Sequence, residues 1–271
     1  MTNYEDSIGA MSRHGNHMLA ICGDSGSGKS TLAKVISVYL ADSIVVECDR
    51  YHKWERGHER WKSVTHLNPV ANDLPLMNRD AWDLKQGVPI IREEYDHLTG
   101  KFTNPKEIKP STTNIMCGLH TFYGTEDLYD LKIFMDTDAE LKTQWKIIRD
   151  SNERGYASSE VIEQIRIRQA DYTRFLKPKI DKADLIVNFC SEVGAVDAAK
   201  GIGRSLRLFI KDTYDVEGML EKFEGVVEQA KSTRPGFFQL NAKTYRQINE
   251  NFYYDYVMIC VLDLLVQCAK N

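Results

Sequence analysis

The chain has 271 residues, of which 42% are hydrophobic, enough for one substantial core with a small appendage. Its formal net charge is −4, so no overall positive field would attract nucleic acid. The polar stretch 1–16 lacks the apolar run of a signal peptide and is expected to be flexible, and no apolar run is long enough for a membrane span. Six cysteines without metal-ligand spacing favour a reduced, cytoplasmic protein.

Short apolar runs alternate along the chain with longer stretches of helical periodicity. Strands are predicted at 18–22, 43–48, 114–117, 131–135, 184–189 and 206–210. Helices are predicted at 29–40, 73–86, 139–153, 158–176, 217–231 and 249–269. Two segments, 54–72 and 89–110, are expected to be loops. This alternation predicts an α/β fold with a mainly parallel sheet, helices on both faces, and ligands at the carboxyl ends of the strands.

A glycine-rich segment stands between the first predicted strand and the first predicted helix. Its pattern, G-x-x-x-x-G-K-S, is that of a phosphate-binding loop. Lys29 would neutralise the β- and γ-phosphates of a nucleotide, and the Ser30 hydroxyl would ligate Mg²⁺. The sequence therefore predicts a nucleoside triphosphate site. The residues expected to contact the nucleotide are Gly23, Asp24, Ser25, Gly26, Ser27, Gly28, Lys29, Ser30 and Thr31.

A second group of polar residues follows the second predicted strand. Asp49 could accept a proton from a substrate hydroxyl, which is what a kinase requires of its base. His52, Arg56 and Arg60 could hold an anionic group beside it. On composition alone, a solvated charged loop explains the segment equally well.

From the phosphate-binding loop to about residue 190, the chain resembles the phosphoribulokinase/uridine kinase family. The resemblance is carried by short motifs in a characteristic order: Cys48-Asp49-Arg50-Tyr51-His52, Glu55-Arg56, Thr65-His66-Leu67-Asn68-Pro69, Ala71-Asn72, Tyr95-Asp96-His97-Leu98-Thr99-Gly100, Gly118-Leu119-His120, Trp145-Lys146, Arg149-Asp150, Glu153-Arg154-Gly155, Arg168, Asp171 and Pro178. The stretch 65–72 favours the phosphoribulokinase branch of the family over the uridine kinases.

The resemblance implies ATP- and Mg²⁺-dependent phosphorylation of ribulose 5-phosphate to ribulose 1,5-bisphosphate. It implies that Asp49 is the catalytic base, and Asp49 and Ser30 are the candidate metal ligands. The remaining roles that it implies fall on basic and aromatic residues: Lys29, Arg149 and Arg154 near the transferred phosphoryl group, and His52, Arg56, Tyr95, His97 and Arg168 at the sugar phosphate. The alternatives are uridine or another pentose or pentose phosphate as acceptor, or a catalytically weakened nucleotide-binding homologue.

The chain departs from the family pattern at two places. The family has an acid that helps hold Mg²⁺ where this chain has Cys117, and a neutral thiol is a poor ligand for a hard cation. Either Asp49 and water complete the metal shell, or the enzyme is slow or prefers a softer ion, or catalysis is lost. Ser27 and Glu47 occupy the positions of the redox-active thiols of photosynthetic members, so we expect no thiol switch.

We expect a P-loop kinase domain over 17–212 and a C-terminal helical extension over 213–271 that packs on the same domain. Cys22 and Cys48 are expected in the core. The aromatic residues at 252–256 are expected to pack a helix rather than to stack on a base. The expected partners are a small-molecule sugar phosphate and a second copy of the chain in a homodimer, with no nucleic acid and no membrane.

Overall fold

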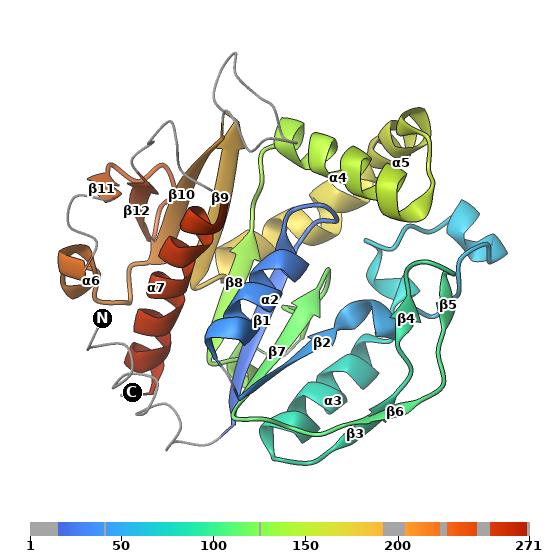
Figure 1. Cartoon of the computed structure of the whole chain (residues 1–271), viewed down its shortest axis with the longest axis horizontal. Helices are drawn as coiled ribbons and strands as arrows, with labels where there is room; N and C mark the ends of the chain where they lie inside the picture. Colours follow the sequence, from blue (N-terminus) through green and yellow to red (C-terminus); the bar gives the residue numbers. More distant parts are fainter. Residues whose placement is uncertain are drawn as a thin grey trace.

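Eight strands form one sheet in the described part of the protein (Figure 1). In chain order they are β1 (His17–Gly23), β2 (Ser43–Glu47), β7 (Thr113–Gly118), β8 (Leu131–Met135), β9 (Leu185–Ser191), β10 (Arg204–Lys211), β11 (Val227–Ala230) and β12 (Phe237–Ala242). This computed structural model describes residues 16–40, 42–124, 126–191, 204–222, 227–242 and 250–269. The segment expected to be flexible, 1–16, therefore lies outside the described residues except for Asn16.

The strands pair in the order β11-β12-β10-β9-β8-β1-β7-β2, and every neighbouring pair from β9 to β2 is parallel. In the middle of this half, Leu19 of β1 lies opposite Ile115 of β7 and Leu131 of β8. Every residue of β1 is buried, as expected for a parallel strand covered on both faces. All six predicted strands are present, and the predicted α/β fold with a mainly parallel sheet is confirmed.

The sheet continues beyond β9 as an antiparallel half, in which β10 pairs with β9 and β12, and β12 pairs with β11. The prediction of one helix over 217–231 is wrong in its second part, because α6 (Glu217–Lys222) is short and β11 begins at Val227. Leu240 and Ala242, two apart in β12, reach the same core, which is the period of a strand. The extension predicted as helical therefore also adds two strands to the sheet.

Helices cover both faces of the sheet (Figure 1). Besides α6 they are α2 (Lys29–Tyr39), α3 (Leu74–Lys85), α4 (Ala139–Arg154), α5 (Ser158–Asp171) and α7 (Glu250–Cys268). α2 and α7 pack on one face and share a core with side chains of β1, β7 and β8. α3 packs on the other face, together with the π-helical turn η5 (Tyr172–Leu176) and the 3₁₀ segment η6 (Lys177–Lys182). Over the described residues, no helix is both long enough and apolar enough to cross a membrane.

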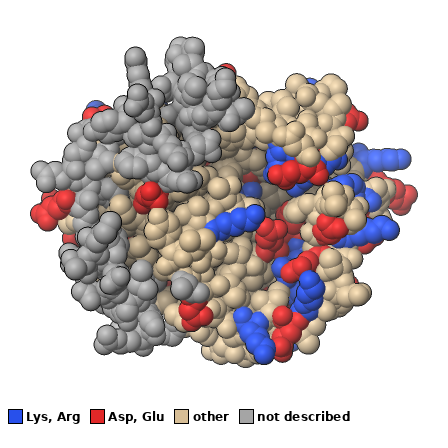
Figure 2. Space-filling model, in the orientation of Figure 1, with Lys and Arg blue, Asp and Glu red and all other residues tan. Residues whose placement is uncertain are grey.

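The segment 89–110, expected to be a loop, contains two short hairpins. β3 (Ile90–Arg92) pairs with β6 (Lys106–Ile108), and β4 (Tyr95–Asp96) pairs with β5 (Lys101–Phe102). Strands of this length give no alternating apolar pattern, so the sequence does not reveal them. Figure 2 shows acidic and basic side chains interspersed on the side of the molecule that carries these hairpins and α5 in Figure 1.

We expect Leu264→Ala in α7 to lower the free energy of unfolding by about 2–5 kcal/mol, because Leu264 is fully buried in the core that α7 shares with α2 and the sheet. The exposed Val38 on α2 is a control, since its side chain is 79% exposed and Val38→Ala should change stability by less than about 0.5 kcal/mol. Urea titrations followed by circular dichroism measure both. Equal stabilities of the two variants would contradict the shared core.

Candidate active site

The phosphate-binding loop connects β1 to the N-terminus of α2. Gly28 caps α2 in a left-handed conformation (φ 92°), and a Cβ there would lie 3.3 Å from the Tyr254 hydroxyl. The Lys29 ammonium donates a hydrogen bond to the backbone carbonyl of Asp24 at 2.7 Å. The Thr137 hydroxyl, just after β8, donates to the carbonyl of Ser27 at 3.0 Å. These bonds fix the loop where helix N–H groups and the helix dipole favour an anion.

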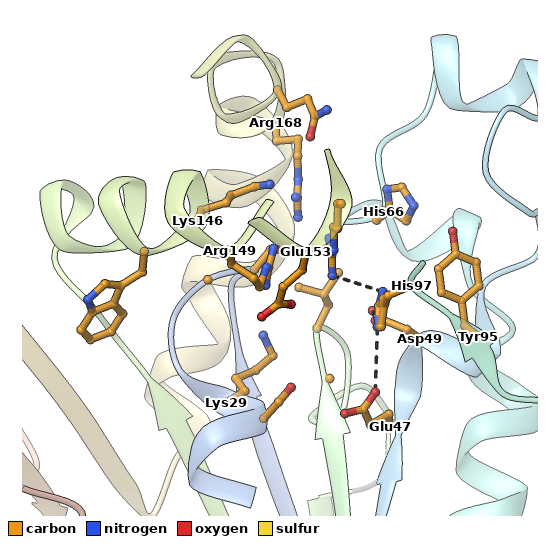
Figure 3. A pocket seen from close by; sticks show the side chains of 18 of the residues that line it. Lys29, Glu47, Asp49, His66, Tyr95, His97, Lys146, Arg149, Glu153 and Arg168 are labelled. Carbon is orange, nitrogen blue, oxygen red and sulfur yellow. Dashed lines mark hydrogen bonds and ion pairs between the residues drawn. The ribbon is translucent and has the colours of Figure 1, made fainter. Parts of the chain in front are cut away.

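A cavity of about 1060 Å³ opens beside this loop and extends to the end of β2. It brings together most of the predicted site residues, which come from five separate segments of the chain. Those that line it are Ser25, Gly26, Gly28, Lys29, Ser30, Thr31, Asp49, His52, Arg56, Tyr95, His97, Arg149, Arg154 and Arg168. Figure 3 shows Lys29, Asp49, His97 and Arg149 projecting toward this common space.

Four predicted site residues do not line the cavity. Gly23 and Ser27 lie in the loop but are buried against neighbouring structure. The Asp24 carboxylate lies beside a second, much smaller cavity. Arg60 is exposed on the 3₁₀ turn η2 (Glu59–Lys62), so the structure does not bring it to the other basic side chains.

Asp49 leaves β2 at the start of the 3₁₀ turn η1 (Cys48–Tyr51). Its carboxylate lies 3.4 Å from Nε2 of His97 and 3.7 Å from Nε2 of His52, and the side chain is 33% exposed. Burial alone would raise the pKa of Asp49, but attraction to these imidazoles and to Lys29 outweighs it and holds the pKa below its ordinary value. Asp49 is therefore an ionised acceptor that faces the same cavity as Lys29.

Basic side chains of α4 gather around one buried carboxylate. Asp150 pairs with Lys146, with Arg149 at 2.8 Å and with Arg154 at 3.3 Å. Burial would raise the pKa of Asp150, but its hydrogen bond from Lys146 and the charge of Arg149 outweigh burial and lower it. Arg149 also donates to the Ser25 hydroxyl at 3.1 Å, which joins α4 to the loop. Asp150 thus holds three cations over the phosphate-binding loop.

Asp24 plays a similar part for α5. Its carboxylate lies 2.9 Å from Lys142 of α4 and 3.4 Å from Arg168 of α5. Burial would raise its pKa, but these two cations outweigh it and lower the pKa of Asp24. The loop is therefore tied to both helices through one of its own side chains.

Arg154 and Arg56 both bind the segment that carries His97. Arg154 lies 3.2 Å from Nδ1 of His97, and Arg56 donates to the carbonyls of His97 at 2.5 Å and of Leu98 at 3.2 Å. Gly155 adopts a left-handed conformation (φ 72°) and ends α4 directly after Arg154. The end of the cavity beside His97 is thus built from the end of α4 and the β4–β5 hairpin.

Oxygen donors suited to a hard cation line the cavity beside Lys29: the Ser30 hydroxyl and the carboxylates of Glu47 and Asp49. Cys117 lies among them, but burial raises the pKa of its thiol to about 12, and its hydrogen bond with Ser30 only partly opposes this. A protonated thiol does not ligate Mg²⁺, so the fit to Mg²⁺ rests on the oxygen donors. Within the described residues, no group of three or more His, Cys, Asp or Glu side chains could hold a metal by itself, so phosphates and waters would complete its shell.

Sequence reasoning missed several residues that line the cavity. Tyr254 of α7 reaches Gly28, although the aromatic residues at 252–256 were expected only to pack a helix. Tyr253 and Tyr256 do lie in the core, whereas the side chain of Phe252 lies outside the described residues. No local pattern connects the C-terminal helix to the loop, so the sequence held no signal for Tyr254.

Two other lining residues lay close to recognised motifs. Trp145 precedes Lys146 in a motif to which no role was assigned, and Glu47 is the last residue of β2. Cys22 and Cys48 are buried, as predicted. All six cysteines are free thiols.

A family model described as "Phosphoribulokinase / Uridine kinase family" matches residues 18–195. The chain belongs to the phosphoribulokinase/uridine kinase family. A phosphoribulokinase of Synechocystis sp. is 33% identical over 174 residues, which cover 63% of this chain and 52% of that protein. A uridine kinase of Borrelia duttonii is 31% identical over 202 residues, which cover 72% of this chain and 97% of that protein.

The fold of this family member has a solved counterpart. The structure of phosphoribulokinase from Rhodobacter spheroides aligns with a TM-score of 0.69 over 94% of this chain and 99% of that chain. Its sequence identity is 17%, so this likeness concerns the fold alone. The chain spans about half the length of the curated phosphoribulokinases that it matches.

Two further histidines, the half-buried His66 and the buried His120, lie near Asp49. His66 stacks on Trp61, with ring centroids 3.8 Å apart, and its carbonyl lies 3.2 Å from Nε2 of His120. Nδ1 of His120 lies 3.0 Å from the buried Lys179 ammonium. Burial lowers the pKa of His66 to about 2 and that of His120 to about 3. Both imidazoles are therefore neutral at physiological pH.

These low values predict a pH dependence of stability. Between the unfolded pKa of 6.5 and about pH 3, His120 takes up a proton only on unfolding, so the free energy of unfolding falls as pH falls. His120→Gln should reduce that slope by up to about 1.4 kcal/mol per pH unit between pH 6 and 4. Urea titrations over this pH range measure the slope. Parallel profiles for the variant and the original protein would contradict the neutral state of His120.

Proposed function

We propose that this protein is an ATP-dependent kinase that phosphorylates a hydroxyl group of a sugar phosphate, with ribulose 5-phosphate as the first candidate. The observation that carries the proposal is that Lys29 and Asp49 line the same cavity. This cavity joins the phosphate-binding loop to the ionised carboxylate of Asp49, which can accept a proton. Family membership supports phosphoryl transfer from ATP. The names of the relatives divide between phosphoribulokinase and uridine kinase, so the choice of acceptor rests on the site.

The charge of the cavity supports a phosphorylated acceptor. The acidic side chains that line it are Glu47, Asp49 and Glu153. The basic side chains that line it are more numerous: Lys29, Lys34, Arg56, Lys146, Arg149, Arg154 and Arg168. Nε of Arg154 and Nε of Arg168 are buried without a hydrogen-bond partner in the structure, which makes these cations candidates for a further anionic ligand. A nucleoside acceptor brings no charge to pair with them, whereas a sugar phosphate does.

In the proposed reaction the acceptor hydroxyl attacks the γ-phosphorus of ATP, and the bond from that phosphorus to the bridging oxygen of ADP breaks. The hydroxyl proton passes to the carboxylate of Asp49. A carboxylate of low pKa is a weak base, which suits a loose transition state in which the hydroxyl loses its proton late. Lys29, Arg149 and Arg154 would stabilise the charge on the phosphoryl oxygens, and Mg²⁺, when bound, would neutralise charge on the phosphates.

The test of the proposed function is an ADP-release assay with ribulose 5-phosphate, uridine and a set of other pentose phosphates. We expect turnover with ribulose 5-phosphate and little with uridine, because the cavity is rich in cations. Activity with uridine alone would overturn the sugar-phosphate assignment. Tight ATP binding without turnover of any acceptor would favour a nucleotide-binding homologue, the alternative suggested by the neutral thiol of Cys117.

We expect Asp49→Asn to lower kcat by a factor of about 10²–10⁴ and to leave the affinity for ATP unchanged, because the carboxylate acts only in the chemical step. Asp83→Asn on α3 is a matched control, since the Asp83 side chain is 30% exposed and pairs with Arg79 away from the cavity. Steady-state kinetics and nucleotide titrations separate the two effects. A near-normal kcat in Asp49→Asn would show that another group takes the proton.

A further inference from the structure

Glu47 lines the cavity beside the phosphate-binding loop. It is the last residue of β2 and lies opposite Cys117, near the end of β7, in the parallel register. Partners in a parallel pair project from the same face of a sheet. Cys117 packs in the core beneath α2, and Val45, two residues before Glu47, packs against that core as well. The side chain of Glu47 therefore projects from the face of the sheet that α2 covers.

The Glu47 side chain reaches the cavity beside the loop. It lines this space together with Lys29 and Ser30, and Figure 3 shows its carboxylate in the same part of the cavity as Asp49. Its carboxylate lies 3.9 Å from Nε2 of His97, and the side chain is 45% exposed. A contact at this distance leaves the carboxylate oxygens able to accept a further ligand.

The side chains of Cys117 and Asp49 at this point are less available to a hard cation than that of Glu47. Cys117 is only 4% exposed and packs in the core, and a cysteine sulfur is a poor ligand for a hard cation. Asp49 is already engaged with His52 and His97 and is the proposed proton acceptor. Mg²⁺ in kinase sites uses one or two carboxylates together with phosphate oxygens and waters. A carboxylate on β2 can supply this ligand while Asp49 stays available for the acceptor hydroxyl.

We propose that Glu47 is a ligand of the divalent cation in the nucleotide complex, directly or through one water, beside the Ser30 hydroxyl. This inference rests on the proposed function, because it requires a nucleotide and its metal in the cavity. It assigns separate tasks to two carboxylates at the end of one strand: Glu47 to the metal and Asp49 to the acceptor.

The test measures metal binding rather than turnover. The full chain is saturated with ADP, and its affinity for Mn²⁺ is measured by electron paramagnetic resonance of the free ion. We expect Glu47→Gln to weaken Mn²⁺ binding to the ADP complex by at least about tenfold, since even partners outside the metal shell cost 10–100-fold. ADP affinity without metal should stay the same, because glutamine keeps the size of the side chain.

Two controls separate a metal ligand from other roles. Glu94→Gln removes a carboxylate of similar exposure, 47%, which pairs with Arg50 at 3.9 Å and does not line the cavity, so Mn²⁺ affinity should not change. His97→Gln removes the imidazole next to Glu47. It should leave Mn²⁺ affinity close to that of the original protein if Glu47 acts on the metal itself.

The outcomes are distinguishable. Unchanged Mn²⁺ affinity in Glu47→Gln, with ADP and Mn²⁺ still bound, would overturn the assignment of Glu47 and leave the proposed kinase function intact. An equal loss in His97→Gln would overturn it as well, because Glu47 would then act by positioning His97. Failure of the original protein to bind ADP would overturn the proposed function and the metal role together.

Discussion

Because β2, β7 and β1 pair in parallel, their carboxyl ends lie together at one edge of the sheet. The cavity forms there, and the segments that follow the three strands bring different functional groups to it. β1 leads into the loop of Lys29, β2 leads into the turn of Asp49, and β7 ends at Gly118. A Cβ on Gly118 would lie 2.5 Å from Cβ of Cys48, so the absence of a side chain at 118 lets the turn that carries Asp49 pack closely. A one-residue slip in register would turn every strand side chain to the opposite face, and the buried core forbids it.

Two carboxylates balance the charge of the basic side chains around the cavity. Asp150 holds the cations of α4, and Asp24 holds Lys142 and Arg168 against the loop. A buried cation without a partner is costly, so these acids allow basic side chains to be assembled before any ligand arrives. The basic side chains of the cavity still exceed its acidic ones, and a polyanion would complete the balance.

The sequence predicts best what is encoded locally. The phosphate-binding loop is a contiguous pattern, and Asp49 directly follows a strong β-strand signal, so both could be placed at the edge of the sheet. The interpretation of 43–48 as strand placed Glu47 inside an element, whereas β2 ends there and Glu47 reaches the cavity. Arg60 looked equivalent to Arg56, but the turn η2 directs it to solvent.

Features that depend on distant contacts were not predictable. The second part of 217–231 has helical composition, yet β11 gains its hydrogen bonds from β12 across a turn, and pairing outweighs local propensity. The hairpins of 89–110 are too short for periodicity. Tyr254 reaches Gly28 only because α7 packs beside α2, which no pattern near either residue indicates.

The position of Tyr254 also links ligand binding to the stability of α7. The wall of the cavity combines the first loop of the fold with its last helix, so an occupant touches elements that are more than two hundred residues apart in the chain. Binding to the native state alone stabilises every element that must unfold before the ligand escapes. Occupancy of this cavity therefore links the stability of the C-terminal helix to that of the phosphate-binding loop.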